Sequence, residues 1–131
     1  MSSPTVILCV DDEPKGLMVR RLLLSIAGYD VLTAGSGDIA LRILRRNHVD
    51  LVITDCFLPD LPGAQIVSEI RRLKPYVSIV LLTNSVDPPA GTELVDLLLI
   101  KCMKPPEFLS EIAKLVAQQR SDVNGLAPAG K

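Results

Sequence analysis

This chain has few aromatic residues and almost no excess of charge of either sign. Phe, Trp and Tyr together make up 3% of the 131 residues, and Trp is absent. The chain therefore lacks a set of rings on which the bases of single-stranded nucleic acid could stack. The formal net charge is −1 and the pI is about 5.8, so we expect neither general binding to nucleic acid nor binding to an acidic membrane surface.

Long apolar runs and closely spaced cysteines are missing as well. No run approaches the roughly 20 apolar residues that a membrane-spanning helix needs. The first residues show no basic region followed by an apolar stretch, so no signal peptide is visible and we expect a cytoplasmic protein. Cys9, Cys56 and Cys102 are far apart in the chain, which excludes a disulfide framework and argues against a zinc site. Cys9 and Cys102 are expected to be small buried residues.

What the chain does contain is an alternation of two kinds of segment. Short runs rich in Val, Ile and Leu are typical of strands that are buried on both faces. These runs are Thr5 to Val10, Tyr29 to Ala34, Leu51 to Thr54, Ser78 to Thr83 and about Leu98 to Met103. Each is followed by a segment with apolar residues at helical spacing. The alternation predicts an α/β fold of three layers, in which helices cover both faces of a parallel five-stranded sheet.

The predicted helices are not equally well marked. The first has an apolar stripe made of Val19, Leu22, Leu23 and Ile26. Arg20 and Arg21 lie outside this stripe and are expected to face solvent. The fourth helix is weak, because residues 87–91 include two prolines and cannot form a regular helix throughout. Residues 120–131 contain Gly, Ala and Pro without periodicity, so we predict a folded domain over 1–119 and a flexible tail over 120–131.

Polar residues gather where the predicted strands end, which is where ligands bind in such sheets. These residues are Asp11, Asp12 and Glu13 after the first strand, Asp55 after the third, Thr83, Asn84 and Ser85 after the fourth, and Lys104 after the fifth. Neighbouring carboxylates repel each other unless a cation offsets their charge, and Mg²⁺ suits two or three carboxylates. Such a site, with a lysine and a hydroxyl beside it, suits a phosphoryl group, which an aspartate can itself accept.

The same strand ends carry the motifs of a known family. Over about residues 5–119 the chain resembles a response-regulator receiver domain of two-component signalling, similar in size to the single-domain chemotaxis regulators. The matching residues are Val10-Asp11-Asp12-Glu13-Pro14, Asp55 with Pro59 and Gly63 after it, Leu82-Thr83, Lys104-Pro105, and Ala34, Gly37, Ala40 and Leu41. The resemblance implies a flavodoxin-like sheet with strand order 2-1-3-4-5.

The resemblance also implies a Mg²⁺ site and assigns its ligands. Asp12 would bind the metal directly and Asp11 mostly through water. Asp55 and the backbone carbonyl of Phe57 would complete the protein's share of the ligands.

Asp55 is further implied as the phosphoacceptor. Thr83 would donate a hydrogen bond to the phosphoryl group, and Lys104 would pair with it. A sensor histidine kinase or a phosphotransfer protein would supply the group, and an unnamed downstream protein would recognise the result. A member of this family catalyses only its own phosphorylation and slow dephosphorylation, so no enzyme acting on other substrates is expected. Phosphorylation would repack the surface of the fourth helix, fifth strand and last helix, which is also the implied surface for a homodimer.

Four features depart from the family pattern and keep alternatives open. They are Asn84 where the family prefers Ala or Gly, Lys101 where it has an aromatic switch residue, Leu97-Leu98 where it has a small pair, and Pro88-Pro89 in the fourth helix. Lys101 is expected at the surface. These departures motivate the main alternative, a receiver-like interaction module regulated without phosphorylation. A phosphatase of the haloacid-dehalogenase type is disfavoured, because its two aspartates are two residues apart whereas Asp11 and Asp12 are adjacent.

The apolar stretch Leu94–Ile100 also has two interpretations. It is either a buried helix end followed by the fifth strand, or a surface that is partly exposed for a partner.

Overall fold

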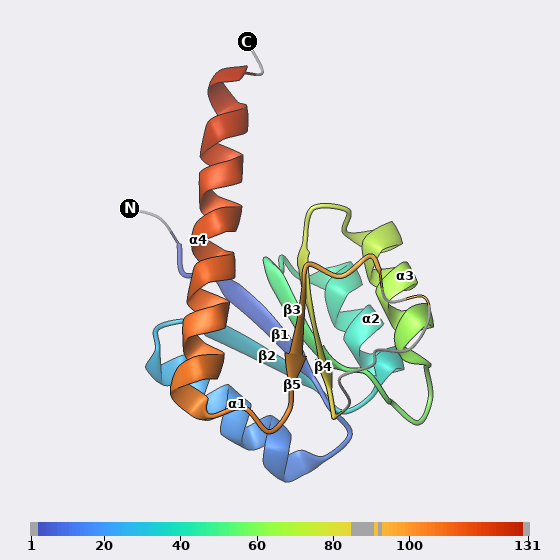
Figure 1. The fold of residues 1–131 in the computed structure, drawn as a ribbon. Helices are drawn as coiled ribbons and strands as arrows, with labels where there is room; N and C mark the ends of the chain where they lie inside the picture. The colour runs from blue at the N-terminus through green and yellow to red at the C-terminus, as the bar shows by residue number, and fades with distance from the viewer. Residues whose placement is uncertain (1–2, 85–90, 92, 130–131) are drawn as a thin grey trace.

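A parallel sheet of five strands forms the centre of the computed structural model, which describes residues 3–84, 91 and 93–129 (Figure 1). The strands are β1 (Val6–Val10), β2 (Asp30–Ala34), β3 (Leu51–Asp55), β4 (Ser78–Thr83) and β5 (Leu97–Ile100). Their order in the sheet is β2-β1-β3-β4-β5, and every pair is parallel. The predicted α/β class and strand order are therefore confirmed. Within the described ranges, no helix is long and apolar enough to cross a membrane.

The helices cover both faces of this sheet (Figure 1). Helices α2 (Gly37–Arg46) and α3 (Gly63–Leu73) lie on one face, and α1 (Pro14–Ile26) and α4 (Pro105–Ala129) lie on the other. Helix α4 projects beyond the sheet and continues through Ala129. Residues 120–129 of the predicted flexible tail are thus helical, and the flexibility of the tail stays a prediction. The domain limit at residue 119 stays a prediction.

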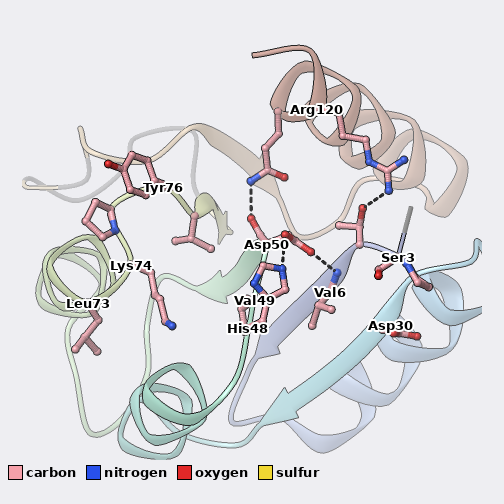
Figure 2. A pocket seen from close by; sticks show the side chains of 15 residues that line it. Ser3, Val6, Asp30, His48, Val49, Asp50, Leu73, Lys74, Tyr76 and Arg120 are labelled. Carbon is pink, nitrogen blue, oxygen red and sulfur yellow. Dashed lines mark hydrogen bonds and ion pairs between the residues drawn. The ribbon is translucent and has the colours of Figure 1, made fainter. Parts of the chain in front are cut away.

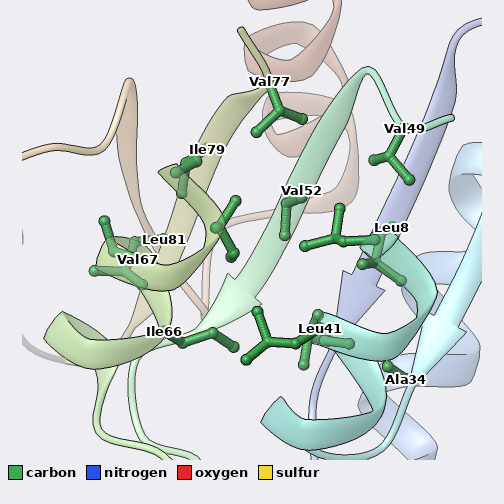
Figure 3. Close-up of a cluster of buried hydrophobic side chains, with 14 of the residues drawn as sticks. Leu8, Ala34, Leu41, Val49, Val52, Ile66, Val67, Val77, Ile79 and Leu81 are labelled. Atoms are coloured by element: carbon green, nitrogen blue, oxygen red, sulfur yellow. The ribbon is translucent and has the colours of Figure 1, made fainter. Parts of the chain in front are cut away.

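Each face of the sheet has its own apolar core. Alternate side chains of a strand point to opposite faces, so β1, β3 and β4 contribute to both cores. Figure 3 shows the core beneath α2 and α3, which includes Leu8, Leu41, Val52, Ile66, Ile79 and Leu81. The core beneath α1 and α4 includes Ile7, Leu24, Ile53, Val80 and Ile112. This double use explains why the strand sequences are apolar throughout instead of alternating.

Helix α1 is rotated relative to the prediction. Leu24 is its buried residue, whereas Val19, Leu22 and Ile26 of the expected stripe are 53%, 55% and 84% exposed. Apolar residues occur almost all round this helix, so spacing alone does not select the face. The expected outward position of Arg20 is also wrong, because its side chain is only 15% exposed.

Strand β5 is shorter than predicted. It ends at Ile100, and residues 101–103 form a turn before α4. In the stretch Leu94–Ile100, Leu99 is buried while Leu94 is 54% exposed, and residues 93–96 form no helix. A partner at this surface stays a prediction. The predicted fourth helix, including Pro88-Pro89, falls mostly on residues 85–90 and 92, outside the described residues, and 93–96 form turns and bends.

Arg71 of α3 positions the chain that leads into β5. Its guanidinium donates to the carbonyl oxygens of Val77 at 2.6 Å and Leu94 at 2.8 Å, and to Asp96 Oδ2 at 2.9 Å. The same Asp96 oxygen accepts the backbone N–H of Ile79 at 2.7 Å. These bonds hold the start of β5 beside β4, so that the residue following β5 reaches the carboxyl edge of the sheet.

The buried β3 side chains are expected to dominate stability. Ile53 is 0% exposed in the core beneath α1 and α4. Ile53→Ala is therefore expected to lower the free energy of unfolding by about 2–5 kcal/mol, through lost burial and a residual cavity. The matched control is Ile26→Ala, at a site that is 84% exposed, with an expected change within about 0.5 kcal/mol. Urea unfolding measures both, and equal losses would contradict the prediction.

Candidate functional site

Three carboxylates meet at the carboxyl edge of the sheet. Asp11 and Asp12 directly follow β1, and Asp55 is the last residue of β3, the strand beside it. Asp11 is 2% and Asp55 6% exposed, while Asp12 is exposed. Each offers an oxygen atom, and these atoms all lie within 4.8 Å of one another. The structure thus brings together the three acidic residues that the sequence predicts as a cluster.

Backbone groups of the adjoining loops hold the two buried carboxylates. The N–H of Glu13 donates to Asp11 Oδ1 at 3.0 Å, and the N–H of Phe57 donates to Asp55 Oδ1 at 3.2 Å. The loop after Asp55 folds back tightly, since a Cβ on Gly63 would lie 2.6 Å from the carbonyl oxygen of Cys56. Only glycine fits this close approach. The hydrogen bond from the Phe57 N–H places the backbone of Phe57, a predicted ligand, next to Asp55.

The lysine in contact with Asp55 is Lys101, and the expectation that Lys104 pairs with the phosphoryl group stays a prediction. Lys101 Nζ donates to Asp55 Oδ2 at 2.8 Å and lies 3.4 Å from Asp11 Oδ2. Its side chain is 21% exposed, which also corrects its predicted surface position. Because β5 ends at Ile100, Lys101 is the first residue past the strand, whereas Lys104 is exposed immediately before α4. A signal existed in the sequence, because Lys101 is the first polar residue after the apolar run Leu97–Ile100.

A second cation, Arg20, reaches the cluster from helix α1. Its guanidinium forms an ion pair with Asp11 Oδ2. The local sequence pattern does not predict this contact.

The charges of this cluster stabilise each other. Burial by itself would raise the pKa of Asp11, but the Glu13 N–H and the positive charges of Lys101 and Arg20 outweigh it and lower that pKa. Burial would likewise lower the pKa of Lys101, but the hydrogen bond to Asp55 and the charges of Asp55 and Asp11 raise it above its ordinary value. Asp11 and Lys101 are therefore both charged at neutral pH.

Thr83 lies at the same edge, as predicted. It ends β4, the strand beside β3, and it is fully buried. Its carbonyl oxygen accepts the N–H of Lys101 at 2.8 Å, which ties the end of β4 to the start of the turn after β5. Asn84 follows it and is exposed. The hydroxyl-bearing residue and the lysine thus come from neighbouring strand ends.

The chemistry of the donor set fits a hard divalent cation. Three carboxylate oxygens within 4.8 Å of one another are ligands that Mg²⁺ accepts together with water. The described side chains of the cluster include no sulfur or imidazole ligand, so a softer metal has no advantage here.

The three cysteines are not members of the carboxylate cluster. Burial raises the pKa of the Cys9 thiol to about 12, which keeps it neutral as a packed core side chain. Burial and the nearby charge of Asp55 raise the pKa of Cys56. Cys102 is exposed, contrary to the prediction that it is buried.

A separate hollow of about 870 Å³ lies at the opposite, amino-terminal edge of the sheet (Figure 2). Its polar groups are largely paired with each other. Asp50 accepts from the N–H of Val6 at 2.8 Å and contacts His48 at 2.8 Å, and Gln119 donates to the Asp50 carbonyl at 2.7 Å. Arg120 donates to Thr5 at 2.9 Å. These bonds fasten α4 to β1 and β3, so we interpret this region as structural.

Comparison of the sequence with known proteins identifies one family. The profile of the response regulator receiver domain matches residues 7–117. The "probable transcriptional regulator ycf27" of Porphyridium aerugineum is 34% identical over 132 residues, 95% of this chain and 54% of that protein. The "transcriptional regulatory protein GlrR" of Escherichia coli K12 is 41% identical over 80 residues, 61% of this chain and 18% of that protein. The chain thus spans about half or less of the length of these curated relatives.

Solved structures give the same result. The CheY-like receiver domain protein of Methanospirillum hungatei has a TM-score of 0.85 and 22% identity, with 92% of this chain and 99% of that chain covered, and this likeness concerns the fold alone. The response regulator TrrA of Thermotoga maritima, crystallised with Mg²⁺–BeF, has a TM-score of 0.79 and 31% identity, with 85% and 98% covered.

Proposed function

We propose that this chain, which belongs to the family of response regulator receiver domains, is a phosphorylation-controlled signalling switch. Asp55 accepts a phosphoryl group from the phosphohistidine of a sensor histidine kinase or a phosphotransfer protein. The reaction depends on Mg²⁺, and hydrolysis slowly removes the group. The observation that carries this proposal is the ion pair of Lys101 with Asp55 inside the cluster of three carboxylates.

The carboxylate of Asp55 acts as the nucleophile. One of its oxygens forms a bond to phosphorus while the phosphorus–nitrogen bond of the donor breaks, and the electron pair of that bond stays on the imidazole. Asp11, Asp12 and Asp55, with the Phe57 carbonyl, would hold Mg²⁺, and the cation would reduce the repulsion between the anionic donor and the carboxylates. Asp55 is oriented for attack by the Phe57 N–H, which engages its other oxygen.

Two further residues receive the phosphoryl oxygens. Lys101 takes the role that the sequence analysis assigned to Lys104, because its ammonium already lies on Asp55 Oδ2. The Thr83 hydroxyl, from the neighbouring strand end, donates a hydrogen bond to the same group. A backbone hydrogen bond from the Lys101 N–H to the Thr83 carbonyl joins the two residues.

The output of this switch is contact with another protein. Phosphorylation adds charge beside β5, and the surface of β5 and α4 repacks in response and binds a downstream partner or a second copy of the chain. The relatives named as transcriptional regulators are longer than this chain, so we do not extend their gene-regulating activity to this chain. We place the protein in the cytoplasm, where histidine kinases present their phosphohistidine.

The test of this proposal uses a small phosphodonor. With acetyl phosphate and Mg²⁺, intact-mass spectrometry is expected to detect the gain of one phosphoryl group per chain. Addition of EDTA in excess over Mg²⁺ is expected to abolish the gain, since the three carboxylates then lack the cation that offsets their charge. Gain at the same rate in EDTA would contradict the metal dependence, and no gain at any Mg²⁺ concentration would contradict the proposed function.

The second candidate is a receiver-like interaction module regulated without phosphorylation. One observation favours it, namely that both oxygens of Asp11 are already bonded to protein groups. The absence of any mass gain with acetyl phosphate, in a chain that binds Mg²⁺, would support this candidate.

A further inference from the structure

Arg20 occupies an unusual position for a helix-surface arginine. Its guanidinium turns inward onto Asp11 Oδ2, and only 15% of its side chain is exposed, whereas the adjacent Arg21 faces solvent. Gly16 lies beside this pair, and a Cβ there would be in ordinary van der Waals contact with Arg20 Nη2 at 3.5 Å and Asp11 Oδ2 at 3.8 Å.

The three carboxylates differ in how far protein groups already engage them. Asp11 Oδ1 accepts the Glu13 N–H, and Asp11 Oδ2 bonds to Arg20 with Lys101 Nζ 3.4 Å away. In the parts of the chain that the structure describes, the exposed carboxylate of Asp12 has no hydrogen bond or ion pair. A cation that enters beside Asp12 therefore meets the carboxylate of Asp11, whose two oxygens are both already bonded to protein groups.

We propose that Arg20 and a divalent cation compete for Asp11 Oδ2, so that Arg20 sets the Mg²⁺ concentration at which the site fills. This inference rests on the proposed function, because it takes the three carboxylates as a Mg²⁺ site. Three carboxylates and two cationic side chains leave one net negative charge in the cluster. A divalent cation added without the release of Arg20 would reverse that charge in a largely buried place, which is unfavourable.

Of the two cationic side chains, Arg20 is the one that is released. Lys101 contacts both Asp55 and Asp11, and its backbone is tied to Thr83. Arg20 has Asp11 as its one ion-pair partner among the described residues, and it sits on a long side chain at the edge of α1, from which it can turn to solvent. Metal binding therefore breaks the Arg20–Asp11 pair and leaves the Lys101–Asp55 pair for the phosphoryl group.

The test compares Arg20→Gln with Arg21→Gln. Both variants lose one positive charge from adjacent positions of α1, so the long-range effect on a cation is shared. In isothermal titration calorimetry with MgCl₂ and no phosphodonor, Arg20→Gln is expected to bind Mg²⁺ about 3- to 30-fold more tightly than the wild type, because one competitor for a buried carboxylate is gone. Arg21→Gln is expected to stay within about twofold of the wild type.

The outcomes separate this inference from the proposed function. Equal affinities in Arg20→Gln and Arg21→Gln, with clear Mg²⁺ binding, overturn the competition and leave the proposed function intact. No Mg²⁺ binding in any of the three chains overturns both.

A measurement on the wild type does not depend on how the variants fold. In NMR spectra, the Arg20 Nε–Hε resonance is expected to shift with the same Mg²⁺ dependence as the Asp12 amide. An Arg20 resonance that stays fixed while the Asp12 amide shifts overturns the inference.

Discussion

Asp55→Asn is expected to give a folded protein that gains no phosphoryl group from acetyl phosphate and Mg²⁺. A carboxamide is neutral and a poor nucleophile, so the bond to phosphorus does not form. The asparagine oxygen still accepts the N–H of Phe57, which Asp55 Oδ1 accepts at 3.2 Å in the wild type, so the loop after β3 keeps its support. Intact-mass spectrometry over a time course measures the loss.

Asp12→Asn provides the matched comparison for this variant. It removes the same charge from the exposed carboxylate of the cluster but keeps the nucleophile, so it is expected to retain a slower gain that higher Mg²⁺ partly restores. A phosphoryl group found on Asp55→Asn would show that the acceptor is another residue. Circular dichroism of both variants verifies that the sheet and helices are intact.

Lys101→Met is expected to slow phosphorylation by acetyl phosphate about 100-fold, whereas Lys104→Met is expected to change it less than about threefold. Lys101 Nζ lies 2.8 Å from the attacking carboxylate, so its charge acts where negative charge accumulates in the reaction. Lys104 is exposed in front of α4, where water screens its charge. The initial rate of mass gain, at one Mg²⁺ concentration for all chains, is the measurement.

The two lysine variants control for each other, because each loses one positive charge from the short connection between β5 and α4. Slow phosphorylation of Lys104→Met with an unchanged rate for Lys101→Met would support Lys104, the lysine that the sequence motif implies. Loss of a partner for two buried carboxylates also affects stability, so the free energy of unfolding of Lys101→Met must be measured by urea denaturation. The rate comparison applies to the folded chains.

Much of the fold followed from local sequence, and the reason is physical. The strands of a central parallel sheet are buried on both faces, so β1, β3 and β4 appear in the sequence as continuous apolar runs. Their carboxyl ends necessarily meet at one edge of the sheet. For that reason Asp11, Asp55 and Thr83 were placed correctly without coordinates.

The contact of Lys101 with Asp55 was not predicted, because the limit of an edge strand is weakly marked in sequence. The Lys104-Pro105 pair matched the family motif, and the apolar character of about residues 98–103 favoured a strand to Met103. The pairing of β5 with β4 ends at the Thr83–Ile100 pair, so the chain turns at Lys101. Hydrogen bonding between strands decided which amine reaches Asp55.

The sequence by itself determined the α/β architecture, the strand order through its family motifs, and the acidic edge. Tertiary structure decided which face of α1 is buried, because apolar residues surround most of that helix and the contact of Arg20 with Asp11 joins residues that local periodicity does not connect. It also decided that Lys101 contacts Asp55. Burial patterns are local properties of a chain, whereas the pairing of charges depends on where separate segments meet in space.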